Sequence, residues 1–131
     1  MQKKVVVIGG GIAGMEASAY LSSMEYDVTL LEKSEKLGGH LLNWERLFPT
    51  KRLGSEVLEF LEKGIDSSID VVTNATIKGI EKTQEGVIVK LQEGANVYAD
   101  ALLITTGYDL FDARKKEEYG YGIYDNVITS A

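Results

Sequence analysis

Residues 5–14 read VVVIGGGIAG, and this stretch decides the fold. A continuous run of β-branched residues is typical of a strand that is buried on both faces in a parallel sheet. Apolar residues then recur at intervals of three and four from Ala13 to Met24, which predicts a helix packed on that sheet. We expect its core positions to be Ala13, Ala17, Tyr20, Leu21 and Met24. Val28 to Leu31 supplies a second buried strand.

Three glycines, Gly9, Gly11 and Gly14, spell GxGxxG between the first strand and the helix. Gly9 permits the tight turn, Gly11 lets the backbone approach a pyrophosphate, and Gly14 lets the helix pack closely on the strand. Glu32 ends the second strand, where its carboxylate can accept hydrogen bonds from both ribose hydroxyls and would repel a 2′-phosphate. This order of elements predicts the adenosine half of a dinucleotide site, which NAD and FAD share.

The rest of the chain predicts a second helix and then a change of sheet type. Ser55 is expected to cap a helix that ends near Lys63, with Gly64 as its stop. A third strand is expected over residues 69–73. The alternating apolar pattern from residue 87 and the turn before residue 97 predict an antiparallel β-meander. Residues 101–104 then form a fully apolar strand, so an α/β fold is predicted.

The composition excludes several kinds of chemistry. The chain has 131 residues, no Cys and one His, which removes disulfides, iron–sulfur ligation, thiol catalysis and any metal site with two His ligands. Its net charge of −6 would repel nucleic acid, so an anionic ligand must be bound by local backbone dipoles. No apolar stretch approaches the roughly 20 residues that span a bilayer. We expect a cytoplasmic chain with no membrane span, no metal site and no catalytic acid, base or nucleophile of its own.

Two further features concern the region after the second strand and the end of the last one. Lys33 follows Glu32, and Gly38 and Gly39 come soon afterwards, while residues 105–107 read Thr-Thr-Gly. These features resemble the extended signature and the ATG motif of FAD-binding domains in the two-dinucleotide-binding flavoproteins. In that group the double glycine passes close to the pyrophosphate and ribityl portion of FAD.

This resemblance implies a Rossmann-like FAD/NAD(P)-binding domain, in which the central parallel sheet has helices on one side and the antiparallel β-meander on the other. It implies that the adenine lies near the end of the third strand, beside the backbone of Ile77. His40 could contact the pyrophosphate or the flavin edge, or be an exposed loop residue. The residues expected to bind FAD are Gly9, Gly11, Ile12, Ala13, Gly14, Glu32, Lys33, Gly38, Gly39, His40, Ile77, Thr106 and Gly107.

Two longer stretches carry a more specific resemblance. Residues 38–50 and, above all, residues 108–130, which begin YDLFDARKK and end NVITS, resemble the A-type subunit of heterodisulfide reductase. The resemblance implies a flavoprotein subunit that relays electrons between a nicotinamide or another donor, FAD and iron–sulfur clusters. The chain departs from that family because it has no Cys for a ferredoxin segment and no second GxGxxG for a nicotinamide domain.

We therefore expect residues 1–131 to form a single FAD-binding domain, an incomplete fragment of a longer oxidoreductase. Its partners would be other subunits or domains that carry iron–sulfur clusters and a nicotinamide site. Two alternatives stay open. One is the NAD(H)-binding domain of a dehydrogenase, because the adenosine motif is shared, and the other is a ligand-free scaffold module, because parts of the flavin site are missing. Residues from Tyr108 onward lack periodicity and are expected to pack against this domain or another part of the protein.

Overall fold

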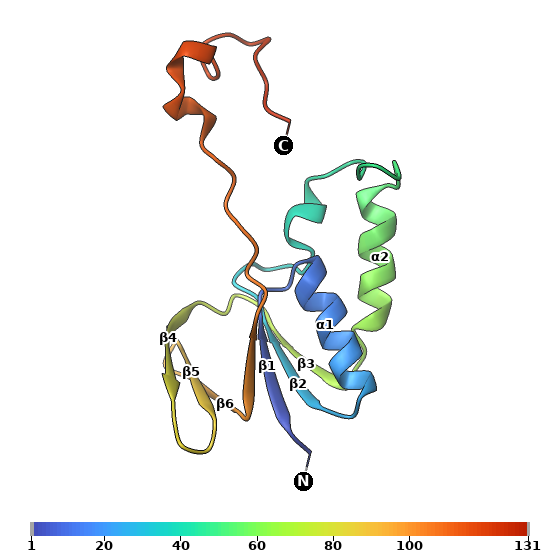
Figure 1. Ribbon diagram of the computed structural model, residues 1–131, viewed down its shortest axis with the longest axis vertical. Helices are drawn as coiled ribbons and strands as arrows, with labels where there is room; N and C mark the ends of the chain where they lie inside the picture. The colour runs from blue at the N-terminus through green and yellow to red at the C-terminus, as the bar shows by residue number, and fades with distance from the viewer. Residues whose placement is uncertain (1, 131) are drawn as a thin grey trace.

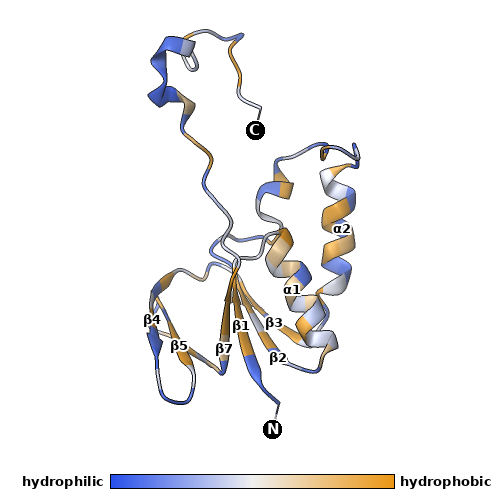
Figure 2. Ribbon diagram, in the orientation of Figure 1, coloured by the Kyte–Doolittle hydropathy of each residue, from blue (hydrophilic) through white to orange (hydrophobic). Residues whose placement is uncertain are grey.

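A four-stranded parallel sheet forms the centre of the computed structural model, which describes residues 2–130 (Figure 1). The strands of this sheet are β1 (Lys4–Ile8), β2 (Asp27–Leu31), β3 (Ile69–Val72) and β7 (Ala101–Ile104). They run in the order β3-β2-β1-β7, and each neighbouring pair is parallel. All four were predicted as strands, and Figure 2 shows that they are largely apolar. β1 and β2 are buried over most of their length, whereas β7 is an edge strand on which Ile104 is 62% exposed.

Helices cover one face of this sheet, and a second sheet covers the other. The helices are α1 (Ile12–Ser23) and α2 (Gly54–Gly64), with a short 3-10 turn at Gly39–Leu42. The second sheet is an antiparallel meander of β4 (Ile77–Lys82), β5 (Val87–Leu91) and β6 (Asn96–Ala99). Figure 1 shows the helices and the meander on opposite sides of the parallel sheet. The predicted fold class is therefore confirmed, although β4 was not predicted as a separate strand.

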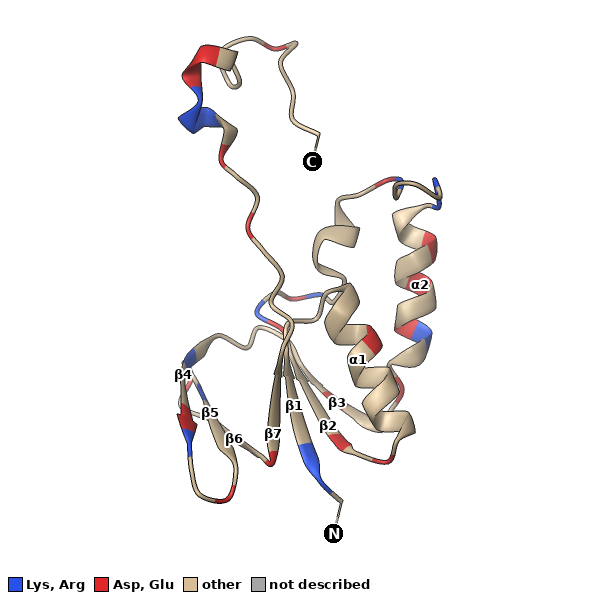
Figure 3. Cartoon of the chain, viewed as in Figure 1, with Lys and Arg blue, Asp and Glu red and all other residues tan. Residues whose placement is uncertain are grey.

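The core follows from the alternation of side chains along β1. Val5 and Val7 pack with apolar residues on the helix side, whereas Val6 and Ile8 pack with residues of the meander such as Val89. Because successive residues of a strand point to opposite faces, a strand covered on both sides must be apolar at every position. This explains the unbroken Val5–Ile8 run that opens the chain. Lys4, the charged residue of β1, lies at its amino end (Figure 3).

The buried face of α1 differs from the predicted one. Tyr20 is 68% exposed and Met24 is 52% exposed, while the buried residues of α1 are Gly14, Met15 and Ser18. At Gly14, α1 lies so close to the end of β1 that no side chain fits between them. A Cβ atom on Gly14 would lie 1.7 Å from the carbonyl oxygen of Gly9. The apolar spacing located the helix correctly, and Leu21 packs against the core cluster that contains Val5 and Val7, but Tyr20 and Met24 are wrong as core positions.

The second helix matches its predicted range, with two corrections at its ends. Its N-cap is Leu53 rather than Ser55, and no side chain caps it. Gly64 lies inside the helix, and Ile65 is the C-cap. A Cβ atom on Gly64 would lie 3.1 Å from the Ala19 side chain, so the glycine serves the contact between α1 and α2 rather than a stop.

The segment after β7 extends away from the layered body (Figure 1). Its backbone hydrogen bonds join residues within the segment, such as Lys115 N with Asp112 O and Val127 N with Tyr124 O. Apolar side chains along it are exposed: Leu110, Phe111, Tyr119, Ile123, Tyr124 and Ile128. Tyr108, at the start of the segment, contacts His40, so the expectation that the segment packs against this domain holds at Tyr108 and fails for the exposed side chains named above. Packing against another part of the protein stays a prediction.

Candidate functional site

The glycine-rich turn joins β1 to α1 and can be built only from glycine at two positions. Gly9 has a φ of +103°, and a Cβ atom there would lie 2.5 Å from the carbonyl oxygen of Thr105. Gly14 meets the Gly9 carbonyl in the same way from the first turn of α1. The predicted roles of Gly9 in the tight turn and of Gly14 in close helix–strand packing are what the geometry shows.

Gly11 differs from these two because it faces open space. A Cβ atom on Gly11 would meet no atom within 4 Å. Gly11 is also the N-cap of α1, where no side chain caps the helix and the first turn holds no acidic residue. The first N–H groups of a helix have no intrahelical partner and carry partial positive charge. Since Gly11 leaves room in front of them, this end of α1 suits an anionic group such as a pyrophosphate.

Glu32 follows β2 and is 7% exposed. Its carboxylate accepts two backbone hydrogen bonds, from Gly10 N to Oε2 at 2.6 Å and from Ser34 N to Oε1 at 2.7 Å. These bonds fix both oxygens beside the glycine-rich turn. Each carboxylate oxygen keeps a further lone pair, so Glu32 can still accept hydrogen bonds from a pair of hydroxyl groups.

The double glycine packs directly against the first glycine cluster. Gly38 N donates to Gly10 O at 2.7 Å, and a Cβ atom on Gly39 would lie 3.2 Å from the Cα atom of Gly11. Gly38 has a φ of +119°, which side chains rarely tolerate. The loop after β2 is thereby held across the N-terminus of α1, as the resemblance to flavoproteins implied.

The Thr-Thr-Gly stretch closes the same region from the side of β7. Thr105 N donates to Ile8 O at 2.8 Å, and the Thr105 hydroxyl lies 2.9 Å from both Ile8 O and Gly9 O. Thr105 therefore fastens the end of β7 to the turn that follows β1. Thr106 and Gly107 continue past that turn.

These loops enclose a cavity of about 570 Å³ at the carboxyl end of the parallel strands. Ligands bind at this end of open parallel sheets, in the crevice where neighbouring loops diverge. The predicted site residues that line the cavity are Gly9, Gly11, Ile12, Ala13, Glu32, Lys33, Gly39, His40, Thr106 and Gly107. The structure thus brings most of the predicted site together around one cavity.

Three predicted residues do not line it. Gly14 and Gly38 support the residues that line the cavity: Gly14 packs against the Gly9 carbonyl group, and Gly38 N donates to Gly10 O. Ile77 begins β4 and packs against the core cluster between the two sheets. The assignment of Ile77 to the adenine stays a prediction, and its partly buried side chain has a structural role here.

The cavity is also lined by residues outside the predicted set of site residues: Ser34, Lys36, Leu42, Asn43, Trp44, Ile104, Thr105, Tyr108 and Asp109. Two of them form a stack with His40. The His40 and Trp44 rings are 5.5 Å apart and 12° from parallel, and the His40 and Tyr108 rings are 5.0 Å apart and tilted by 30°. His40 Nε2 lies 3.0 Å from Tyr108 O. Two sequence features could have indicated these aromatic residues: the single Trp near the double glycine and the Tyr two residues after Thr106.

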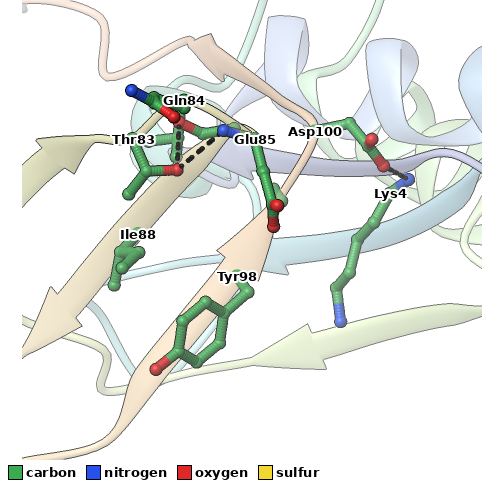
Figure 4. Close-up of a pocket in the computed structure, with 10 residues that line it drawn as sticks. Lys4, Thr83, Gln84, Glu85, Ile88, Tyr98 and Asp100 are labelled. Carbon is green, nitrogen blue, oxygen red and sulfur yellow. Dashed lines mark hydrogen bonds between the residues drawn. The ribbon is translucent and has the colours of Figure 1, made fainter.

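A second hollow, of about 650 Å³, lies beside the amino end of β1 (Figure 4). Its lining includes Lys4, Tyr98 and Asp100. Asp100 accepts hydrogen bonds from Lys4 N at 2.8 Å and Lys3 Nζ at 2.9 Å, and these bonds, the backbone one first, lower the pKa of its carboxyl group. This hollow lies at the end of the sheet opposite the glycine-rich turn, so we do not assign it to the ligand.

The described residues give two further findings. Within residues 2–130, no helix combines the length and the apolar character needed to cross a membrane. The same residues contain no group of three or more His, Cys, Asp or Glu side chains that could hold a metal ion.

The arrangement suits an elongated ligand with a ribose at Glu32 and a pyrophosphate at the N-terminus of α1. The fixed Glu32 carboxylate can bind the ribose. The uncapped N–H groups of α1, with open space at Gly11, can bind the pyrophosphate. The fold and this cavity together define the class as a Rossmann-type domain of the kind that holds dinucleotides.

The chain belongs to the pyridine nucleotide-disulphide oxidoreductase family, which matches residues 1–123. It is also similar to the A-type subunit of an H2/formate:CoB-CoM heterodisulfide,ferredoxin reductase from Methanococcus maripaludis, with 23% identity over 99% of this chain and 32% of the relative. The resemblance to the A-type subunit of heterodisulfide reductase is therefore confirmed. The chain spans about a third of the length of the curated relatives that it matches over almost its whole length.

Solved structures share the fold. An L-proline dehydrogenase from P. horikoshii matches with a TM-score of 0.70 and 23% identity, over 82% of this chain and 23% of that one. The flavoprotein disulfide reductase RclA from Escherichia coli matches with a TM-score of 0.56 and 24% identity, over 80% of this chain and 21% of that one.

Proposed function

We propose that this chain binds the ADP portion of FAD and acts as the FAD-binding part of an electron-transferring oxidoreductase related to the A-type subunit of heterodisulfide reductase. The observation that carries the proposal is the fixed Glu32 carboxylate beside the open, uncapped N-terminus of α1. Glu32 would accept the hydrogen bonds of the adenosine ribose, and the helix N–H groups would hold the pyrophosphate.

FAD is favoured over NAD by the parts of the site beyond the shared adenosine motif. The double glycine against Gly11 and the Thr-Thr-Gly turn match the motifs of FAD-binding domains in the flavoproteins that the chain resembles. Family membership and the fold shared with a flavoprotein disulfide reductase support the same assignment. When bound, FAD supplies the ring that accepts and donates electrons, and the residues of this chain bind and orient it.

The electron-transfer role would belong to a larger assembly. The relative from Methanococcus maripaludis is by name one subunit of a heterodisulfide and ferredoxin reductase. Because this chain has no Cys, iron–sulfur clusters would lie on other subunits or domains, as would a nicotinamide site. We propose that residues 1–131 act as one FAD-binding domain within that assembly, in the cytoplasm.

Titration of the ligand-free chain with FAD, FMN, NADH and ADP tests the proposal. A ligand that binds only the folded state raises the melting temperature, by an amount that grows with its concentration over the dissociation constant. We expect FAD and ADP to raise it. No shift with either ligand would overturn the proposal and favour a scaffold module, and a shift with NADH but not FAD would favour an NAD-binding domain.

Gly11→Val is the matching variant. Because a Cβ atom on Gly11 meets nothing within 4 Å, the variant should fold normally and block only the approach of the pyrophosphate. We expect the FAD and ADP shifts to disappear while the melting temperature of the free chain stays unchanged. Gly79→Val on β4 is the matched control, because Gly79 also faces open space but lies on the meander.

A further inference from the structure

We infer that the loop before α2 is a docking site for an acidic segment of another protein, with Phe48 as the apolar anchor of the contact. The loop comprises residues 46–52 and carries three basic side chains, Arg46, Lys51 and Arg52. None of its residues lines the cavity beside the glycine-rich turn. The inference therefore concerns a separate surface and does not rest on the proposed function.

Hydrogen bonds fix the shape of this loop. Leu47 N donates to Arg52 O at 2.9 Å, and Lys51 N donates to Leu47 O at 2.7 Å. The Arg46 guanidinium adds a third bond, from Nη1 to Lys51 O at 3.0 Å. Lys51 has a φ of +57°, a left-handed conformation that residues with side chains rarely adopt, and these bonds hold it there. A loop that is already ordered loses little conformational entropy when it binds a partner.

Two neighbouring apolar residues of the loop have opposite surroundings. Leu47 packs against the core cluster that contains Met15 and Leu41, and so anchors the loop to the domain. Phe48 is 97% exposed, the largest exposed fraction of any large apolar side chain in residues 2–130. Covering this ring with apolar side chains of a partner would remove it from water. A single fixed aromatic residue often supplies much of the binding energy of an interface.

The charge of the loop is opposite to that of the whole chain. Residues 46–52 hold three basic residues and no acidic one, whereas the chain has a net charge of −6. Figure 3 shows basic residues on the loop just before α2. All three are exposed, and no salt bridge within residues 2–130 includes them. Each therefore keeps donors for the carboxylates of a partner that covers Phe48.

Extended polyanions fit this loop less well than an acidic protein segment. A nucleic acid or an anionic membrane presents a wide negative surface, which the net charge of −6 would repel beyond the loop. Binding to such a membrane typically uses clusters of about four to eight basic residues, and this loop has three. A protein segment with a few carboxylates and apolar side chains needs to contact only the loop.

The test is calorimetric titration of the full chain, at low ionic strength, with a synthetic peptide of Glu residues interspersed with Leu. We expect binding that weakens as salt is added, because ion pairs at an exposed surface are screened. Phe48→Ser should weaken the binding by about tenfold, as expected for the anchor of an interface. Phe60→Ser is the matched control, because Phe60 is also exposed but lies on α2.

The contribution of the basic residues is measured in Lys51→Gln and Arg52→Gln. Each substitution should weaken peptide binding by about threefold and reduce its dependence on salt, since one exposed ion pair is lost. Lys78→Gln removes the same charge from an exposed position on β4 and should change neither quantity.

Amide chemical shifts of the wild-type chain give a readout that needs no variant. The peptide should shift the signals of residues 46–52, and shifts confined to other residues would overturn the inference. So would a wild-type chain that does not bind the peptide, an equal loss in Phe48→Ser and Phe60→Ser, or equal binding of a peptide in which Lys replaces Glu. Binding to phosphatidylserine vesicles but not to the peptide would overturn it in favour of a membrane.

Discussion

Thr105 joins the end of β7 to the glycine-rich turn after β1. Its hydroxyl lies 2.9 Å from the carbonyl oxygens of Ile8 and Gly9, where β1 gives way to the glycine-rich turn. Thr105→Val keeps the shape of the side chain and removes this donor. We expect a loss of about 1 kcal/mol in the free energy of unfolding, measured by urea denaturation, because a hydrogen bond to partly buried carbonyls is lost.

Thr105→Ser is the control for this prediction, because serine keeps the hydroxyl. It should retain most of the stability that valine loses. A Thr105→Val chain as stable as the wild type would show that the hydroxyl contributes nothing to holding the turn.

At the scale of single residues, the sequence predicted the site residues whose roles depend on local spacing. Gly9, Gly14 and Glu32 lie within one strand–helix–strand unit, where the required conformation follows from a few neighbouring residues. The contact between His40 and Tyr108 joins residues 68 positions apart. No periodicity in one sequence indicates such a pair, so the aromatic side of the cavity emerged only from the fold.

At the scale of elements, Asp100 ties the start of β7 to the start of β1. Its carboxylate accepts hydrogen bonds from Lys4 N and Lys3 Nζ, which lower its pKa below the ordinary value of 3.8. A group with a lowered pKa in the folded state stabilises the fold above its unfolded pKa, and the contribution is lost as the pH falls through the folded value.

We therefore expect Asp100→Asn to be less stable than the wild type at neutral pH and to approach it at acidic pH, below 3.8. Urea denaturation across this range measures the difference. Asp70→Asn on β3 is the control, since it removes an exposed Asp of the same sheet. A difference that stays constant with pH would contradict the assignment to the charged carboxylate.

The elements also show where pattern reasoning fails. The apolar spacing in α1 is real, but Gly14 and Ser18 are among its buried residues, and a Cβ atom on Gly14 would clash with the glycine-rich turn. The requirement for a glycine at position 14 can be recognised only from interatomic distances in the folded chain. The strand β4 was missed because most of it is exposed and carries Lys and Glu, which weaken the alternating pattern.

At the scale of the whole molecule, the segment after β7 should contribute little to stability. Removing residues 111–131 keeps Tyr108 and its contact with His40. We expect the free energy of unfolding to change by less than about 0.5 kcal/mol, because the segment's hydrogen bonds are local and exposed amides open readily. Thermal denaturation of the shortened chain measures this, and a clearly lower melting temperature would show that the segment packs on the body.

The relative from Methanococcus maripaludis is longer than this chain within the region that the two share. The aligned region covers 211 residues, more than the 131 residues of this chain, so the relative has additional residues within the part that the two share. This chain keeps the layered fold without them, and its meander passes directly from β5 to β6 through the Glu93-Gly94 turn.

The hydrogen bonds from Ser34 and Gly10 to Glu32, and from Gly38 to Gly10, link the loops after β1 and β2 into one continuous network. Flexible loops that become ordered only on binding subtract their lost conformational entropy from the affinity. Here that entropy is already lost when the chain folds. Ligand association at the Glu32 side should therefore proceed with little rearrangement of the backbone, as a rigid fit to a preorganised surface.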